Sequence, residues 1–147
     1  MSYWDTSCLV KLYTPETDSA VFRARLATRP DCVTCDVAPL EFWATVRRKE
    51  TEGVLTAGQA RQVQSALQAD ITAGMIRVIS CDAAVRGKFD DFIEQCHAAM
   101  PPIFLRTNDA LHLAAARSAG ETEIVTTDKK LREAAVALGF SIYPVGC

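Results

Sequence analysis

The spacing of apolar residues predicts helices that alternate with short strands along the whole chain. Over several segments the apolar residues recur every three to four positions, which places them on one face of an α-helix. The helices predicted in this way span residues 7–14, 17–28, 36–53, 56–72, 82–98, 107–120 and 128–138. Shorter apolar runs predict strands at residues 2–5, 32–35, 75–79, 123–127 and 140–143.

Turn and cap residues set the limits of several of these elements. Pro15 ends the first helix, because proline has no backbone N–H to continue it. Gly53 and Gly120 end two others. Asp36 is a candidate N-cap of the helix after the second strand, whose first turn tolerates Pro39.

Short apolar strands between helices indicate an α/β fold with a parallel sheet. The chain has 147 residues and shows no linker, repeat or low-complexity stretch, so we expect one domain over residues 1–147. Parallel sheets of this kind bind ligands beyond the carboxyl ends of their strands. Candidate functional residues are therefore sought at those ends.

Composition narrows the class of protein. Hydrophobic residues make up 49% of the chain and charged residues 23%, as in folded globular proteins. No apolar run approaches the ~20 residues that cross a bilayer, and no secretory signal is visible, so we expect a cytoplasmic protein without a membrane segment. The net charge of −2 shows no basic excess, so binding to nucleic acid would depend on local basic groups such as residues 47–49 or Lys129, Lys130 and Arg132. Solvated helix surface explains each of these groups, taken alone, better than nucleic-acid binding does.

The chain contains six cysteines, at positions 8, 32, 35, 81, 96 and 147. In a reducing compartment they would remain thiols. Cys32 and Cys35 match C-x-x-C, but in a strand their side chains would point in different directions. No second pair is spaced for a zinc site of the usual kind. We therefore interpret the cysteines as small buried hydrophobic residues.

Four acidic residues stand at or near the predicted strand ends. Asp5 ends the first strand and Asp128 ends the fourth, while Glu41 and Asp109 lie early in the helices that begin near residues 36 and 107. If the helices pack normally, the four converge at one edge of the sheet. Each alone has a common explanation: a helix cap for Asp5 or Asp128, the helix dipole for Asp109, a solvated position for Glu41.

Electrostatics indicates what such a cluster would need. Two carboxylates about 4 Å apart repel by ~1 kcal/mol in water and by ~4 kcal/mol at an effective dielectric constant near 20. A cation relieves this repulsion, and oxygen ligands suit Mg²⁺ or Mn²⁺ better than zinc. These ions orient a phosphodiester and activate water, so the cluster predicts phosphoryl chemistry.

Four segments of the chain carry a resemblance to a known family. They read YWDTSCLVKLY at residues 3–13, APLEF at 38–42, LRTNDALHLA at 105–114 and VTTDKKL at 125–131. In this order they resemble PIN-domain ribonucleases, most closely the VapC-type toxins of type II toxin–antitoxin systems. The chain departs from the family pattern at Cys35, Asn108 and Thr127, and no departure removes a carboxylate.

The resemblance implies a three-layer α/β/α fold with a central parallel sheet of about five strands. It implies a Mg²⁺- or Mn²⁺-dependent endoribonuclease that hydrolyses RNA with a metal-activated water. Asp5, Asp109 and Asp128 would bind metal, and Glu41 would complete the cluster as a ligand or by positioning the water. Three further residues carry hydroxyl groups near the cluster: Thr6, Ser7 and Thr126. These hydroxyls would orient metal ligands or phosphate, or else only cap the adjacent helices.

The resemblance also implies partners. An antitoxin would bind a groove formed by the helices between residues 9 and 71, and a homodimer is expected. Two alternatives remain open: a housekeeping RNA-processing nuclease of the same fold, and an inactive PIN-like module that binds RNA or protein. His112, three residues after Asp109, is a possible general base, although packing beside the site explains it better.

Overall fold

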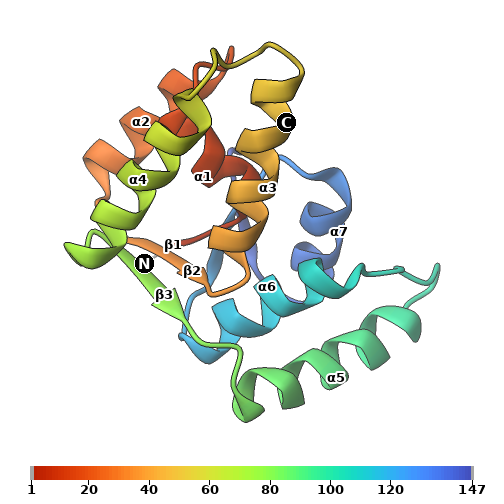
Figure 1. The fold of residues 1–147 in the computed structure, drawn as a ribbon. Coiled ribbons are helices and arrows are strands. Elements are labelled where there is room, and N and C mark those ends of the chain that lie inside the picture. Colours follow the sequence, from red (N-terminus) through yellow and green to blue (C-terminus); the bar gives the residue numbers. More distant parts are fainter. Residues whose placement is uncertain (1, 147) are drawn as a thin grey trace.

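A five-stranded parallel sheet forms the centre of the molecule (Figure 1). The structure is a computed structural model that describes residues 2–146. Its strand order is β3-β2-β1-β4-β5, and every neighbouring pair is parallel, which confirms the predicted sheet. The strands are β1 (Ser2–Trp4), β2 (Cys32–Cys35), β3 (Ile76–Ile79), β4 (Glu123–Val125) and β5 (Ser141–Tyr143).

The predicted helices are all present, with ends that shift by a few residues. They are α1 (Thr6–Tyr13), α2 (Ser19–Thr28), α3 (Ala38–Thr51), α4 (Gln59–Thr72), α5 (Ala83–His97), α6 (Thr107–Ser118) and α7 (Lys129–Ala137). Within residues 2–146, none of these helices has the length and apolar character needed to span a bilayer. The chain builds β1, β2 and β3 outward in one direction and then returns to place β4 and β5 on the other side of β1.

Helices cover both faces of the sheet, which confirms the predicted three-layer α/β/α arrangement (Figure 1). Alternate strand residues point to opposite faces. Trp4 therefore packs in the cluster formed with α1 to α4, while Tyr3 packs in the cluster formed with α5 to α7. Cys32 and Cys35 divide between the same two clusters, as their strand positions predicted.

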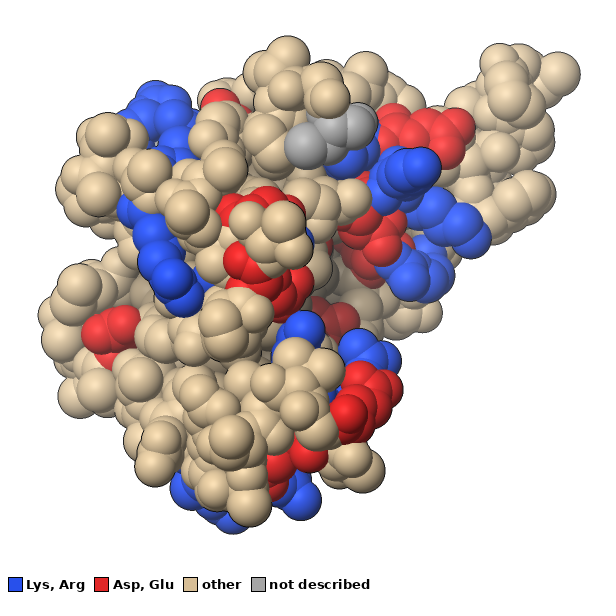
Figure 2. Space-filling view, turned by 90° about the horizontal axis from the view of Figure 1, so that it is seen from above, with Lys and Arg blue, Asp and Glu red and all other residues tan. Residues whose placement is uncertain are grey.

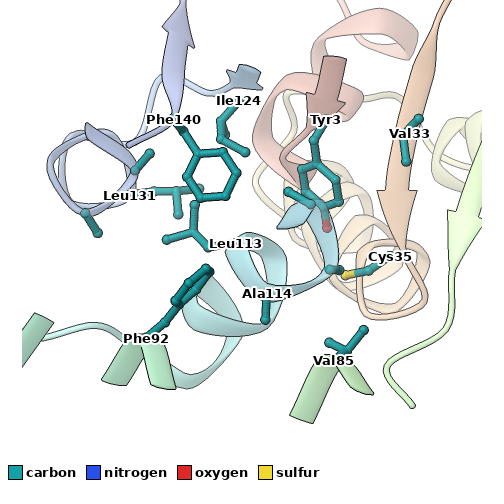
Figure 3. Close-up of a cluster of buried hydrophobic side chains, with 14 of the residues drawn as sticks. Tyr3, Val33, Cys35, Val85, Phe92, Leu113, Ala114, Ile124, Leu131 and Phe140 are labelled. Atoms are coloured by element: carbon teal, nitrogen blue, oxygen red, sulfur yellow. The ribbon is translucent and has the colours of Figure 1, made fainter. Parts of the chain in front are cut away.

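Helix α6 lies close against the sheet because its buried face consists largely of alanines. Ala110, Ala114, Ala115 and Ala116 are all fully buried. Figure 3 shows the cluster on this side, where Leu113 of α6 lies among the side chains of α5, α7 and the strands. The close packing brings the first turn of α6 to the carboxyl edge of the sheet.

Helix α3 begins differently from the prediction. Its first residue is Ala38, the residue before it is Val37, and no side chain caps this end. Asp36 instead accepts a hydrogen bond from the backbone N–H of Cys81, at 3.1 Å, and donates its own N–H to the carbonyl of Ile79, at 3.0 Å. The predicted cap at Asp36 is wrong because this carboxylate is bound to the segment that follows β3.

Candidate functional site

The four predicted acidic residues line a single pocket beyond the carboxyl ends of β1 and β4. The pocket has a volume of about 620 Å³ and is bordered by α1, α3, α6 and the N-terminus of α7. Its lining includes Asp5, Glu41, Asp109 and Asp128, together with Thr6, Ser7 and Arg106. The structure thus brings together side chains that are separated by up to 123 positions in the sequence.

Asp5 stands at the N-cap position of α1, but hydroxyl groups hold its carboxylate, which does not cap the helix. Its backbone N–H continues the sheet by donating to the carbonyl of Val125, at 3.0 Å, and its side chain makes no capping bond to α1. One carboxylate oxygen accepts hydrogen bonds from Ser7 Oγ, at 2.6 Å, and Thr126 Oγ1, at 2.9 Å. These two hydroxyls fix the orientation of the carboxylate at the pocket.

Asp128 caps α7 and contributes to the pocket at the same time. Its Oδ1 accepts the backbone N–H groups of Lys130, at 2.9 Å, and Leu131, at 3.0 Å. Its Oδ2 accepts a hydrogen bond from Arg106, at 2.7 Å. Burial raises the pKa of Asp128, but the Leu131 N–H and Arg106 outweigh it and lower the pKa overall.

Arg106 connects two of the carboxylates, a contact that the sequence analysis did not anticipate. Its Nε donates to Asp109 at 2.6 Å, and its Nη2 donates to Asp128 at 2.7 Å. Burial raises the pKa of Asp109, and the guanidinium only partly opposes this effect. The sequence feature that indicates the contact with Asp109 is the i, i+3 spacing of Arg106 and Asp109 at the start of a helix.

Glu41 is fixed by three side chains from two helices. Its Oε2 accepts from Thr6 Oγ1 at 2.5 Å and lies 2.8 Å from His112 Nε2, while its Oε1 accepts from Asn108 at 2.7 Å. Burial raises the pKa of Glu41, but hydrogen bonding and the charge of His112 outweigh it and lower the pKa to about 2. Glu41 is therefore ionised at neutral pH.

His112 is fully buried and contacts the site directly, so the prediction that it merely packs beside the site was incomplete. Its Nδ1 lies 2.8 Å from Tyr3 Oη and 3.6 Å from Cys35 Sγ, on the side opposite Glu41. Burial lowers the pKa of His112, but its contacts with Cys35 and Glu41 raise it overall. The ionised Glu41 carboxylate therefore favours the protonated form of the imidazole.

Only part of the predicted basic surface faces the pocket. Arg48 lines it, whereas Arg132 is buried and donates to the carbonyls of Thr126 and Pro144. Arg132 therefore belongs to the internal structure rather than to a surface patch. Figure 2 shows acidic and basic side chains next to one another on the face seen from above, without one continuous basic area.

The family model described as PIN domain matches residues 2–137. The chain belongs to the PIN-domain family. This PIN domain is 32% identical over 151 residues to Ribonuclease VapC35 of Mycobacterium tuberculosis, covering 99% of this chain and 98% of that protein. Its fold is similar to those of solved toxin structures. The sequence identities to these structures are low, so they establish the fold and no shared function.

Two of these structures illustrate the similarity. Mycobacterium tuberculosis VapC20, described as a toxin that cleaves the sarcin-ricin loop, superposes with a TM-score of 0.70 at 17% identity, over 95% of this chain and 96% of that one. VapBC2 from Rickettsia felis, bound to a DNA fragment of its promoter, gives a TM-score of 0.69 at 15% identity, over 97% of each chain.

The donor set of this PIN domain fits a hydrated Mg²⁺ or Mn²⁺. The pocket offers carboxylate oxygens and no thiol, and Mg²⁺ typically binds one or two carboxylates while keeping several waters. The four acids are not tightly gathered: over residues 2–146, the only three ligand-type residues whose donor atoms lie within 4.8 Å of one another are Cys35, Asp36 and Cys81. The wider spacing of the acids suits ligation through water, with Arg106 partly neutralising two of them.

Proposed function

We propose that this protein is a Mg²⁺- or Mn²⁺-dependent endoribonuclease and the toxin of a toxin–antitoxin pair. One observation carries the proposal: four carboxylates from separate parts of the chain line one pocket at the carboxyl edge of a PIN fold. The nearly full-length similarity to a protein named Ribonuclease VapC35 supports RNA as the substrate. We place this activity in the cytoplasm.

The residues of the pocket have separable roles in this proposal. Asp5, Asp109 and Asp128 would hold the ion, directly or through water. A bound divalent ion lowers the pKa of a water ligand and stabilises the leaving oxygen. Glu41, which is ionised, would complete the cluster as a metal ligand or by accepting a hydrogen bond that positions the attacking water. The hydroxyls of Ser7 and Thr126 keep Asp5 oriented, and that of Thr6 orients Glu41.

We propose a cognate antitoxin as the protein partner. Solved structures with this fold include a toxin–antitoxin complex from Klebsiella pneumoniae, at a TM-score of 0.63 and 16% identity over 90% of each chain. In the present chain, a pocket of about 470 Å³ between α1, α2 and the start of β3 is lined mostly by apolar residues. An apolar helix face fits such a groove. A homodimer remains an additional expectation.

Cleavage of single-stranded RNA by the purified protein tests the proposal. We expect cleavage with Mg²⁺ or Mn²⁺, no cleavage with EDTA, and a loss of at least ~100-fold in Asp5→Asn, since this change removes one ligand charge and keeps the side-chain shape. Asp82→Asn is the matched control, because Asp82 caps α5 and does not line the pocket. Cleavage that needs no metal, or that persists in Asp5→Asn, contradicts the proposal. RNA binding without cleavage would indicate an inactive module instead.

A further inference from the structure

Two cysteines and an aspartate gather at the carboxyl ends of β2 and β3, away from the residues that line the acidic pocket. Cys35 ends β2, Asp36 follows it, and Cys81 stands two residues after the end of β3. The two strands pair in parallel with Cys35 opposite Ile79, so both chain segments leave the sheet side by side. The two Sγ atoms and one carboxylate oxygen of Asp36 lie within 4.8 Å of one another.

The local backbone holds this group together. The carboxylate of Asp36 accepts the N–H of Cys81, at 3.1 Å, and the N–H of Asp36 donates to Ile79, at 3.0 Å. Cys35 is fully buried beside Tyr3 and Val85 (Figure 3), whereas Cys81 is half-buried and Asp36 is exposed. A solvent ion therefore reaches the group from the side of Asp36 and Cys81.

The two thiols of the group differ in their electrostatic surroundings. Burial raises the pKa of the Cys35 thiol, but the hydrogen bond and charge of His112 outweigh it and lower the pKa. Burial, Asp36 and Cys35 together raise the pKa of the Cys81 thiol. A cation bound between the two sulfur atoms and the Asp36 carboxylate would replace the Cys81 proton, which would pass to solvent.

We propose that Cys35, Asp36 and Cys81 form a second metal site, which binds a thiophilic divalent cation of the zinc type. Two soft thiolates and one hard carboxylate suit Zn²⁺, a borderline ion that binds both sulfur and oxygen, whereas the all-oxygen pocket suits Mg²⁺. With Zn–S bonds of about 2.3 Å, tetrahedral ligation needs an S–S separation of roughly 3.8 Å, which requires at most a small closure of the group. Water would occupy the fourth position.

A bound ion would join the end of β2 to the segment that leads into α5. Cys35 also contacts His112, whose other ring nitrogen lies 2.8 Å from Glu41. The second site therefore connects to the acidic pocket through one side chain. Its existence does not depend on nuclease activity.

Titration of the reduced full-length protein with Co²⁺ tests the site, because cobalt bound to thiolate absorbs in the near ultraviolet and cobalt bound to carboxylate oxygens does not. We expect a charge-transfer band that saturates near one equivalent and disappears when Zn²⁺ is added. Cys81→Ser should abolish the band, and Asp36→Asn should weaken cobalt binding about tenfold, as expected for the loss of one charged ligand. Cys96→Ser, at a buried cysteine of α5, and Cys147→Ser are controls that should keep it.

Three results overturn the proposal: no band in the wild-type protein, a band that survives in Cys81→Ser, or unchanged affinity in Asp36→Asn. Circular dichroism establishes that each variant is folded, and if Cys81→Ser does not fold, the exposed Asp36→Asn variant decides. Alkylation and mass spectrometry of the protein purified without reductant give a further criterion. A Cys35–Cys81 disulfide in that sample would show a redox pair in place of a metal site.

Discussion

The contact between Glu41 and His112 makes the free energy of unfolding depend on pH. Because the pKa of Glu41 falls from 4.5 to about 2 on folding, its ionised form stabilises the folded state. That contribution is fully present above pH 4.5 and is lost as the pH falls toward 2. Since Glu41 is partly exposed, we expect it to contribute on the order of 1–3 kcal/mol.

Substitution of Glu41 by glutamine tests this contribution. The amide cannot ionise, so the free energy of unfolding of Glu41→Gln should be lower near neutral pH and should change less than that of the wild type between pH 4.5 and 2. Urea unfolding at a series of pH values measures the difference. The exposed Glu133→Gln variant is the control and should follow the wild type. Parallel curves for Glu41→Gln and the wild type would refute the argument.

In the proposed metal site, Arg106 would compete with the ion for Asp109 and Asp128. Its guanidinium binds Asp109 and Asp128 at 2.6 and 2.7 Å, which supplies positive charge where an ion would otherwise supply it. Arg106→Met should therefore lower the Mg²⁺ concentration for half-maximal cleavage several-fold. An RNA-cleavage titration with Mg²⁺ measures this shift, with the exposed Arg86→Met as the control. A higher Mg²⁺ requirement in Arg106→Met would show that the arginine assists binding instead.

These contacts mark the limit of sequence reasoning at the scale of residues. The four acids could be predicted because each falls at a strand end or an early helical turn. The i, i+3 spacing of Arg106 and Asp109 was a usable signal, but the contacts Arg106–Asp128 and His112–Glu41 could not be predicted, because packing rather than local spacing brings these side chains together. The proximity of Cys35 and Cys81, which lie 46 positions apart in the sequence, could not be predicted for the same reason.

At the scale of elements, the two aspartates that end strands differ in a way the sequence did not reveal. Both stand at the N-cap of a helix, yet only the carboxylate of Asp128 caps one, through two backbone N–H groups, whereas the carboxylate of Asp5 is bound by hydroxyls. The periodicity of apolar residues predicted every helix and strand, because an element that buries one face repeats its apolar residues at the period of that element. Cap identity depends on the competing partners of each carboxylate, as Asp36 also demonstrates.

The double role of Asp128 can be separated by two substitutions. Asp128→Ala removes the cap and should lower the free energy of unfolding by about 1 kcal/mol, as is usual for a lost N-cap. Asp128→Asn retains an oxygen for the cap and should be nearly as stable as the wild type, while both variants lose RNA cleavage. Chemical denaturation and a cleavage assay measure the two effects.

Asp82, which caps α5 through the N–H of Val85 at 3.0 Å, provides the matched comparison. Asp82→Ala should lose a similar amount of stability and keep its cleavage activity, because Asp82 does not line the acidic pocket. Full activity in Asp128→Asn would remove Asp128 from the proposed metal ligands and leave it as a cap alone.

At the scale of the whole molecule, the strand order explains why distant residues meet. The chain returns across the sheet to place β4 beside β1, so the residues that follow these strands, Asp5 and Thr126, become neighbours. The fold also leaves an apolar pocket beside α1 and α2, in the layer formed by α1 to α4. In the proposed function, catalysis and antitoxin binding would therefore occupy different surfaces that share α1 and the sheet.

This separation predicts a variant that escapes inhibition without losing activity. Met75 lines the apolar pocket and is 61% exposed, so a charge there should prevent an apolar helix from docking while leaving the core intact. Met75→Glu should cleave RNA at the wild-type rate alone and should resist inhibition by the co-encoded antitoxin at least ~10-fold, the effect of about 1.4 kcal/mol of lost binding. Val136→Glu, at a 57% exposed residue of α7, should remain inhibited. Equal inhibition of both variants would place the antitoxin on another surface, because a glutamate in the docking groove must weaken binding there.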